Sequence, residues 1–135
     1  MKRICVIDGQ GGGIGATVIK KLKERYGETV EIIALGTNAI ATAQMLKARA
    51  NRGASGENAI VRTVNQVDVI IGPLGIIMAH AMMGEVTVKT AEAIASSSAR
   101  KILIPLSQEN AEIVGVSLLP LPRLIDKLIA KHLNW

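Results

Sequence analysis

The chain has 135 residues, of which 49% are hydrophobic and only 1% aromatic, and its formal net charge is +5. This length predicts one domain, residues 1–135. The positive side chains are dispersed along predicted helices and lack aromatic neighbours for base stacking, which argues against nucleic-acid binding. No apolar run approaches the ~18 residues of a membrane span, and the first residues do not resemble a signal sequence, so we expect a cytoplasmic protein without membrane contact.

The hydrophobic pattern predicts strands that alternate with helices. Continuous apolar, β-branched runs predict strands, and apolar residues at helical spacing predict helices. The alternation predicts an α/β fold: a three-layer, Rossmann-like, mainly parallel sheet with helices on both faces. The predicted strands are residues 3–7, 30–35, a very short one near Ala54, 67–71 and 101–106, and the predicted helices are 13–26, 39–51, 88–99 and one that starts at Pro120 and Pro122.

Three segments leave the pattern open to alternatives. Residues 58–64 alternate like a strand, but the helical spacing of their apolar side chains favours a helix, with Ser55 or Gly56 as its cap. Residues 112–116 predict a possible antiparallel edge strand, reached through a turn at 107–110. Residues 76–83 are apolar on all sides except His80, so they form a buried helix or meet another copy of the protein.

A glycine-rich turn directly follows the first predicted strand. Five glycines fall between positions 9 and 15, and a helix begins within them. The free N–H groups and the dipole at the start of such a helix attract an anion. We therefore expect the turn to bind a phosphate-bearing ligand, with a purely structural turn as the alternative. The residues of this predicted site are Asp8, Gly9, Gln10, Gly11, Gly12, Gly13, Ile14 and Gly15.

The residues that follow the other strands are expected to complete the site, because ligands of such sheets bind over the carboxyl ends of the strands. Asp8 could hold Mg²⁺, or bond to the amides of its own turn, which is the favoured interpretation. Thr37 and Asn38 could bind a ribose or phosphate, or cap the next helix. The full set after the other strands is Gly36, Thr37, Asn38, Ser55, Glu57, Asn58, Gly72, Pro73, Leu74 and residues 107–110.

Two resemblances add to this interpretation. The spacing from Gly9 to Gly15 resembles the opening of short-chain dehydrogenases, but the only Tyr, Tyr26, has Val30 four residues later instead of the Lys that their chemistry needs. Almost the whole chain resembles a family of short bacterial proteins described only as a domain of unknown function. That resemblance, which implies a compact Rossmann-like protein and no assigned activity, rests on residues 6–15, 34–39, 53–59 and 71–76.

We therefore expect a sensor or accessory protein that binds a nucleotide or other phosphorylated small molecule. NAD(P) is one candidate, although neither an acidic residue nor Arg follows the second predicted strand. The alternative is a small oligomeric enzyme that acts on a phosphorylated metabolite, with Asp8, Glu57 or His80 as acid–base groups. A lone His in an apolar segment is more often a packed core residue. The sequence shows no metal-binding cluster.

Residues 74–83 also predict a homodimer, because they leave no polar face for water. Pairing this segment with its own copy would bury it, and its methionines suit such a contact. The alternative is a loop with a short helix, packed beneath the C-terminal helix of the same chain.

Overall fold

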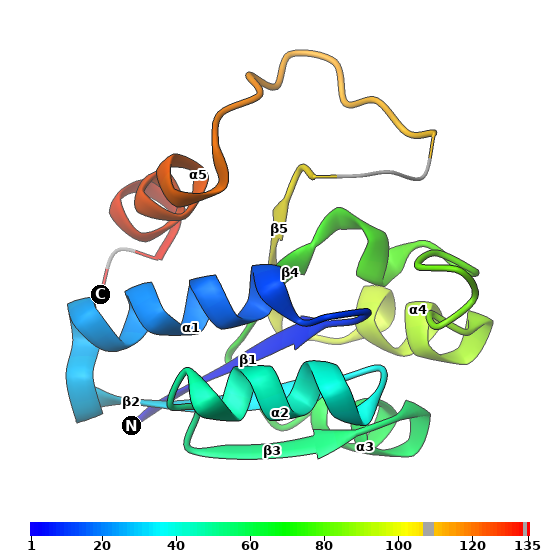
Figure 1. Ribbon diagram of the computed structural model, residues 1–135, viewed down its shortest axis with the longest axis horizontal. Helices are drawn as coiled ribbons and strands as arrows, with labels where there is room; N and C mark the ends of the chain where they lie inside the picture. The colour runs from blue at the N-terminus through cyan, green and yellow to red at the C-terminus, as the bar shows by residue number, and fades with distance from the viewer. Residues whose placement is uncertain (107–109, 134) are drawn as a thin grey trace.

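Figure 1 shows a computed structural model that describes residues 1–106, 110–133 and 135. All five strands of its sheet are parallel, in the order β3-β2-β1-β4-β5. The first strand along the chain is therefore the central one, with Asp8 paired to Gly36 on one side and Val6 to Ile71 on the other. The strands are β1 (Lys2–Asp8), β2 (Val30–Gly36), β3 (Arg52–Ser55), β4 (Val69–Pro73) and β5 (Arg100–Ile104).

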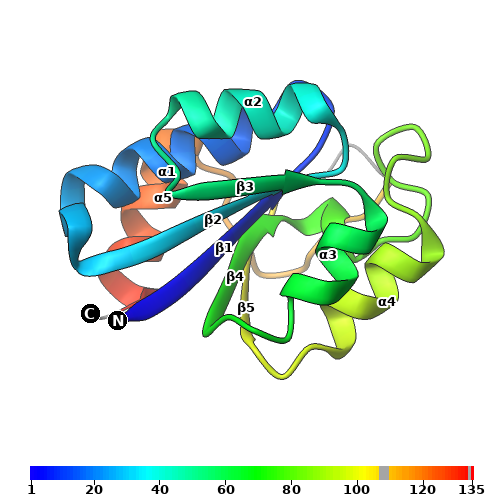
Figure 2. The same cartoon turned by 90° about the horizontal axis from the view of Figure 1, so that it is seen from below.

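Helices cover both faces of the sheet, which confirms the predicted three-layer α/β fold. In Figure 2 the sheet separates α1 and α2 from α3 and α4, and α5 packs beside α1. The helices are α1 (Gly13–Tyr26), α2 (Ala39–Lys47), α3 (Glu57–Thr63), α4 (Val88–Ser96) and α5 (Leu121–Lys127), with the short helical turns η1 (Gly27–Thr29), η2 (Leu74–Ile77) and η3 (Leu128–Leu133). Residues 58–63 are thus helical as favoured, with Val64 as the C-cap and Gly56 rather than Ser55 as the N-cap.

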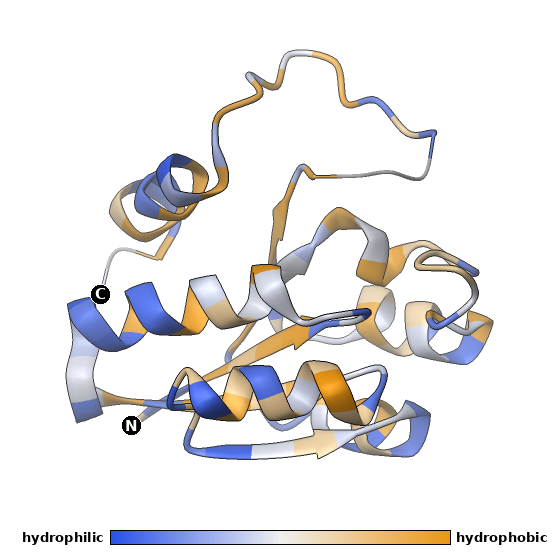
Figure 3. Ribbon diagram, in the orientation of Figure 1, coloured by the Kyte–Doolittle hydropathy of each residue, from blue (hydrophilic) through white to orange (hydrophobic). Residues whose placement is uncertain are grey.

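The core lies on both sides of β1, whose side chains alternate between the two helical layers. Ile4 and Val6 belong to the cluster beneath α1, α2 and α5, whereas Cys5 and Ile7 belong to the cluster beneath α3 and α4. All four are fully buried, as expected for an apolar strand between two layers. Figure 3 shows the same pattern, with hydrophobic strands inside and hydrophilic positions on the outer sides of the helices.

The predicted antiparallel edge strand at residues 112–116 is wrong. These residues form no ladder with β5, which pairs only with β4. Ile113 and Val114 are 45% and 99% exposed, so no layer packs against their side chains, and β-propensity alone does not hold a strand. Gly115, with φ 84°, interrupts the extended backbone further. The predicted turn that should start this strand lies mostly at residues 107–109, outside the described part.

Of the alternatives for residues 76–83, the buried helix is wrong, and the segment is a short helical turn followed by a loop. Only η2 is helical there, and tight turns follow it to residue 86. His80, Met82 and Met83 have φ values of 71°, 57° and 58°, which a right-handed helix cannot contain. The buried apolar side chains of the segment are covered mainly by α4 instead of by the C-terminal helix, whereas Met83 is 95% exposed.

Within the part of the chain that the structure describes, no helix is both long enough and apolar enough to cross a membrane.

Candidate functional site

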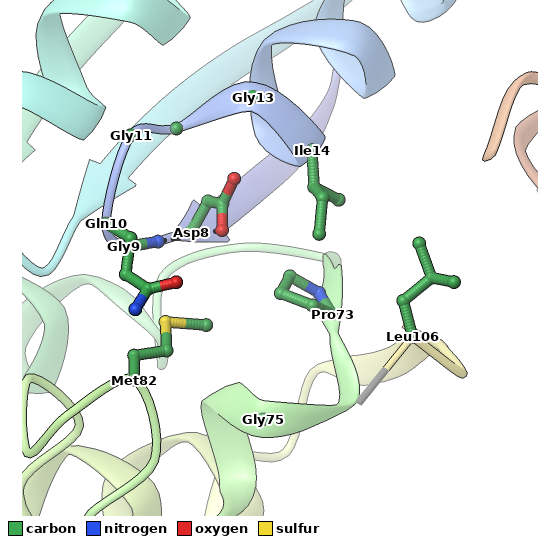
Figure 4. Close-up of a pocket in the computed structure, with 11 residues that line it drawn as sticks. Asp8, Gly9, Gln10, Gly11, Gly13, Ile14, Pro73, Gly75, Met82 and Leu106 are labelled. Carbon is green, nitrogen blue, oxygen red and sulfur yellow. Dashed lines mark hydrogen bonds between the residues drawn. The ribbon is translucent and has the colours of Figure 1, made fainter. Parts of the chain in front are cut away.

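A pocket of about 390 Å³ lies at the carboxyl end of the sheet, between the glycine-rich turn after β1 and the residues after β4 (Figure 4). The chain leaves β1 towards β2 and β3 and later returns to the other side of β1 as β4. The pocket therefore lies at the topological switch point, where doubly wound sheets bind ligands. The residues that line it are Asp8, Gly9, Gln10, Gly11, Gly12, Gly13, Ile14, Pro73, Gly75, Met82 and Leu106.

The glycine-rich turn has one rigid side and one open side. The Gly12 N–H donates to the Gly9 carbonyl at 2.9 Å, and Gly12 has a φ of 75°. A Cβ on Gly12 would lie 2.8 Å from the backbone of Ala41 in α2, so that position accepts no side chain. Gly11 and Gly13 have no such neighbours: a Cβ on either would meet nothing within 4 Å. Among the described residues nothing accepts a hydrogen bond from the amide of either glycine, and both glycines line the pocket.

The carboxylate of Asp8 is held by the turn itself. Asp8 is only 3% exposed, and it accepts hydrogen bonds from the amides of Gly9 (2.8 Å) and Gly15 (2.7 Å). This confirms the favoured interpretation of Asp8 as a partner of its own turn. Burial raises the pKa of the carboxyl, and the amide hydrogen bonds only partly oppose this rise. The Asp8 carboxyl therefore already occupies the amides of Gly9 and Gly15 beside the start of α1.

A second carboxylate, Glu85, reaches the turn from the segment between η2 and α4. Its Oε1 accepts hydrogen bonds from the Gln10 amide (2.8 Å), the Thr37 hydroxyl (2.7 Å) and the Asn38 side-chain amide (2.8 Å). Burial would raise the pKa of Glu85, but these three donors outweigh it and hold the pKa below its usual value. We call Gln10 N–H, Thr37 Oγ1 and Asn38 Nδ2 the three-donor site.

The residues after β2 lie beside the turn without lining the pocket. Asn38 accepts the Ala41 amide at 2.8 Å, so the capping interpretation is confirmed for this residue. Its side-chain amide also donates to the Gln10 carbonyl at 3.0 Å. The Thr37 amide donates to the Asp8 carbonyl at 3.0 Å, which ties the end of β2 to the end of β1. Gly36, at the last pair of the β1–β2 ladder, is buried beneath Thr42.

The remaining predicted site residues separate into two groups. Pro73 lines the pocket, and Gly72 and Leu74 are its chain neighbours without lining it. The residues after β3 lie elsewhere: Ser55 pairs with the Thr42 hydroxyl at 2.7 Å, Glu57 accepts a hydrogen bond from Thr87 at 2.5 Å, and Asn58 is exposed. The shortness of β3 and its place at the edge of the sheet explain this separation.

The three candidate acid–base groups do not share the pocket. Asp8 lines it, but neither Glu57 nor His80 does. His80 is exposed, so the interpretation as a packed core residue is wrong. Its backbone instead organises a turn, with its N–H donating to the Val86 carbonyl at 2.6 Å.

Sequence reasoning missed three residues at the site. Glu85 lies 48 positions from Thr37 in the sequence, so no local pattern joins them. Met82 and Leu106 line the pocket from a turn and from the residue just before the undescribed 107–109. The sequence offered one indication of Glu85: it is the first acidic residue after a long apolar segment. An acidic side chain in such a place is buried only if it has hydrogen-bond partners.

The parallel sheet with helices on both faces and a pocket at its switch point define a doubly wound α/β protein of the Rossmann-like class. The chain belongs to the family described as "Domain of unknown function (DUF3842)", whose model matches residues 3–135. The comparison with curated proteins gave no match.

Two solved structures share features of the fold. A dodecameric FMN-dependent UbiX-like decarboxylase from Escherichia coli O157:H7 is 17% identical, with a TM-score of 0.48 over 82% of this chain and 69% of that one. A universal stress protein in complex with cAMP is 15% identical, with a TM-score of 0.44 over 77% of this chain and 98% of that one. Both similarities concern the fold and not the site.

Proposed function

We propose that this protein binds a small phosphorylated molecule, of nucleotide size, in the pocket at the switch point, and acts as a sensor or accessory protein. The observation that carries the proposal is the open side of the glycine-rich turn. Gly11 and Gly13 lie at the start of α1, where the helix dipole favours an anion, and both residues are exposed and line the pocket.

Size and charge restrict the ligand further. A volume of about 390 Å³ is near the lower end of the range for small-molecule sites, which favours a mononucleotide over a dinucleotide. The described lining residues include no Lys or Arg, and two carboxylates, Asp8 and Glu85, lie at the turn. A ligand with one phosphate is therefore preferred. NAD(P) is disfavoured also because Thr37 and Asn38, which would hold its ribose, already bond to Glu85.

We expect AMP or a sugar monophosphate to raise the melting temperature of the wild-type protein and to give a measurable heat in calorimetry. At a ligand concentration of 100 Kd, binding stabilises the folded state by about 2.7 kcal/mol. Gly11→Val should keep the fold and lose the binding, because its side chain would enter open space at a residue that lines the pocket. The same measurements with NAD(H), NADP(H), ATP, GTP and FAD test whether the protein prefers ligands with one phosphate.

The proposal fails if none of these ligands changes the melting temperature at saturating concentration. It fails equally if Gly11→Val, shown to be folded by circular dichroism, binds as tightly as the wild type. The alternative function, an enzyme with Asp8 as its acid–base group, would need a further group from a second subunit, since Asp8 is the one titratable side chain among the described lining residues.

A homodimer through the segment 74–83 is part of the proposal, with Met83 as its test. Met82 is half-buried against Gly9, so a substitution there would disturb the turn as well. Met83 is 95% exposed and apolar. In analytical ultracentrifugation at micromolar concentration we expect the wild type to be a dimer and Met83→Glu to be a folded monomer. A wild-type monomer of 14.3 kDa would contradict the dimer and leave the ligand proposal intact.

A further inference from the structure

The three-donor site has the composition of an anion-binding subsite. A backbone N–H, a hydroxyl and a side-chain amide, from the ends of β1 and β2, all donate to one oxygen of Glu85 at 2.7–2.8 Å. Short hydrogen bonds to a carboxylate are among the strong ones in proteins. Glu85 belongs to neither strand end, since it comes from the segment 78–87, far along the chain. Its carboxylate therefore stands where an anionic group of a ligand could be held.

This subsite continues the open side of the turn. Gln10, whose N–H donates to Glu85, lines the pocket together with the next residue, Gly11. A phosphate on the exposed part of this turn would therefore lie beside the three-donor site, although Thr37 and Asn38 do not line the pocket themselves. A second phosphate joined to the first would reach for these donors, and it would meet the negative charge of Glu85 there.

The segment that carries Glu85 is neither a helix nor a strand, so its shape depends on individual contacts. His80, Met82 and Met83 have positive φ values, which cost free energy in residues other than glycine. Hydrogen bonds within the segment maintain this shape, from the Gly84 amide to the His80 carbonyl (3.0 Å) and from the Glu85 amide to the Met82 carbonyl (3.1 Å). The Glu85 hydrogen bonds join this segment to the turn, beside the contact of Met82 with Gly9.

We propose that Glu85 is a specificity-determining residue of this pocket, an internal anion that keeps diphosphates out of the three-donor site and admits monophosphates. This inference rests on the proposed function. A monophosphate binds while Glu85 stays in place, whereas a diphosphate must displace the carboxylate and the segment 78–87 with it. Glu85→Gln removes the competing charge and leaves a neutral acceptor, so the three-donor site becomes accessible to the second phosphate.

Calorimetry with AMP and ADP on wild type, Glu85→Gln and Glu92→Gln tests this role. Glu92 is exposed on α4, so its variant removes the same charge away from the site. We expect Glu85→Gln to bind ADP about tenfold more tightly than Glu92→Gln does, and AMP less than about threefold more tightly. Equal ADP affinities for the two variants would overturn the inference while AMP binding still supports the proposed function. If no variant binds either nucleotide, the proposed function itself fails.

A measurement on the wild type keeps the test valid if Glu85→Gln folds poorly. Hydrogen exchange at the Gly84 and Glu85 amides should become faster at saturating ADP and stay unchanged at saturating AMP, because only the diphosphate displaces the segment. Unchanged exchange at saturating ADP would show that Glu85 stays in place, and the inference would be wrong.

Discussion

Gly12→Val is expected to lower the free energy of unfolding by about 3 kcal/mol, the larger of the stability effects that we expect. Two costs add. The φ of 75° is unfavourable for a β-branched residue, and the new Cβ would lie 2.8 Å from the Cα and the carbonyl oxygen of Ala41. These neighbours are backbone atoms of α2 and cannot rotate away. Urea denaturation followed by circular dichroism measures the change, as a midpoint shift of about 1–2 M.

Gly11→Val is the matched control for this prediction. It places the same side chain one residue earlier in the same turn, where no atom lies within 4 Å and φ is outside the left-handed region. Its free energy of unfolding should stay within about 0.5 kcal/mol of the wild type. Equal midpoints for Gly12→Val and Gly11→Val would mean that α2 does not hold the turn as described here.

Asp8→Asn is expected to lower the free energy of unfolding by about 2 kcal/mol at pH 7. The buried carboxylate accepts two amides, one on each oxygen, at 2.8 Å and 2.7 Å. An asparagine offers one acceptor oxygen and one NH₂ group, so either the Gly9 or the Gly15 amide loses its partner without gaining water. Circular dichroism during urea titration measures the loss.

The loss also depends on pH in a defined direction. Because burial raises the pKa of Asp8 above its unfolded value of 3.8, the folded state holds the proton more tightly than the unfolded state. The contribution of Asp8 to stability is therefore largest below pH 3.8 and falls as the pH rises through the folded-state pKa. The advantage of the wild type over Asp8→Asn should accordingly be larger at pH 4 than at pH 7.

Asp68→Asn provides the comparison for Asp8→Asn. Asp68 also accepts a backbone amide, from Arg3 at 2.8 Å, but it is exposed, so water replaces the lost acceptor. We expect a change below about 0.5 kcal/mol. Equal losses for the two variants would show that the burial of Asp8 is not what makes its hydrogen bonds important.

The sequence was sufficient for the layers of the fold and for the place of the glycine-rich turn. Continuous apolar runs such as residues 4–7 are buried on both faces only between two helical layers. The helix ends were also local: Gly27 ends α1 and Thr87 caps the start of α4. The antiparallel strand at 112–116 is wrong because the prediction rested on a short apolar run after a turn, while a strand needs a layer to pack against. The buried helix considered for residues 76–83 is wrong because hydrophobicity carries no information about backbone φ angles, and three of these angles are positive in the segment.

The site was predictable only in part, because only some of its residues are neighbours in the sequence. Residues 8–15 are contiguous, and their position after a strand places them at the switch point without any long-range knowledge. Glu85 arrives there through a sequence of tight turns that no periodicity describes. Pro73 could be placed because it follows β4 directly, whereas Glu57 could not be excluded, since the distance of β3 from the switch point depends on the strand order.

The burial of Cys5 in the central strand has a practical consequence. The chain has one cysteine, and its side chain is fully buried, with a pKa that burial raises well above the usual range. The protonated thiol points from β1 into the cluster beneath α3 and α4, so alkylating reagents reach it only when that helical layer opens from the sheet. The rate of alkylation therefore reports opening of the α3 and α4 layer, without an added label, so the same native thiol can follow how each ligand protects the fold.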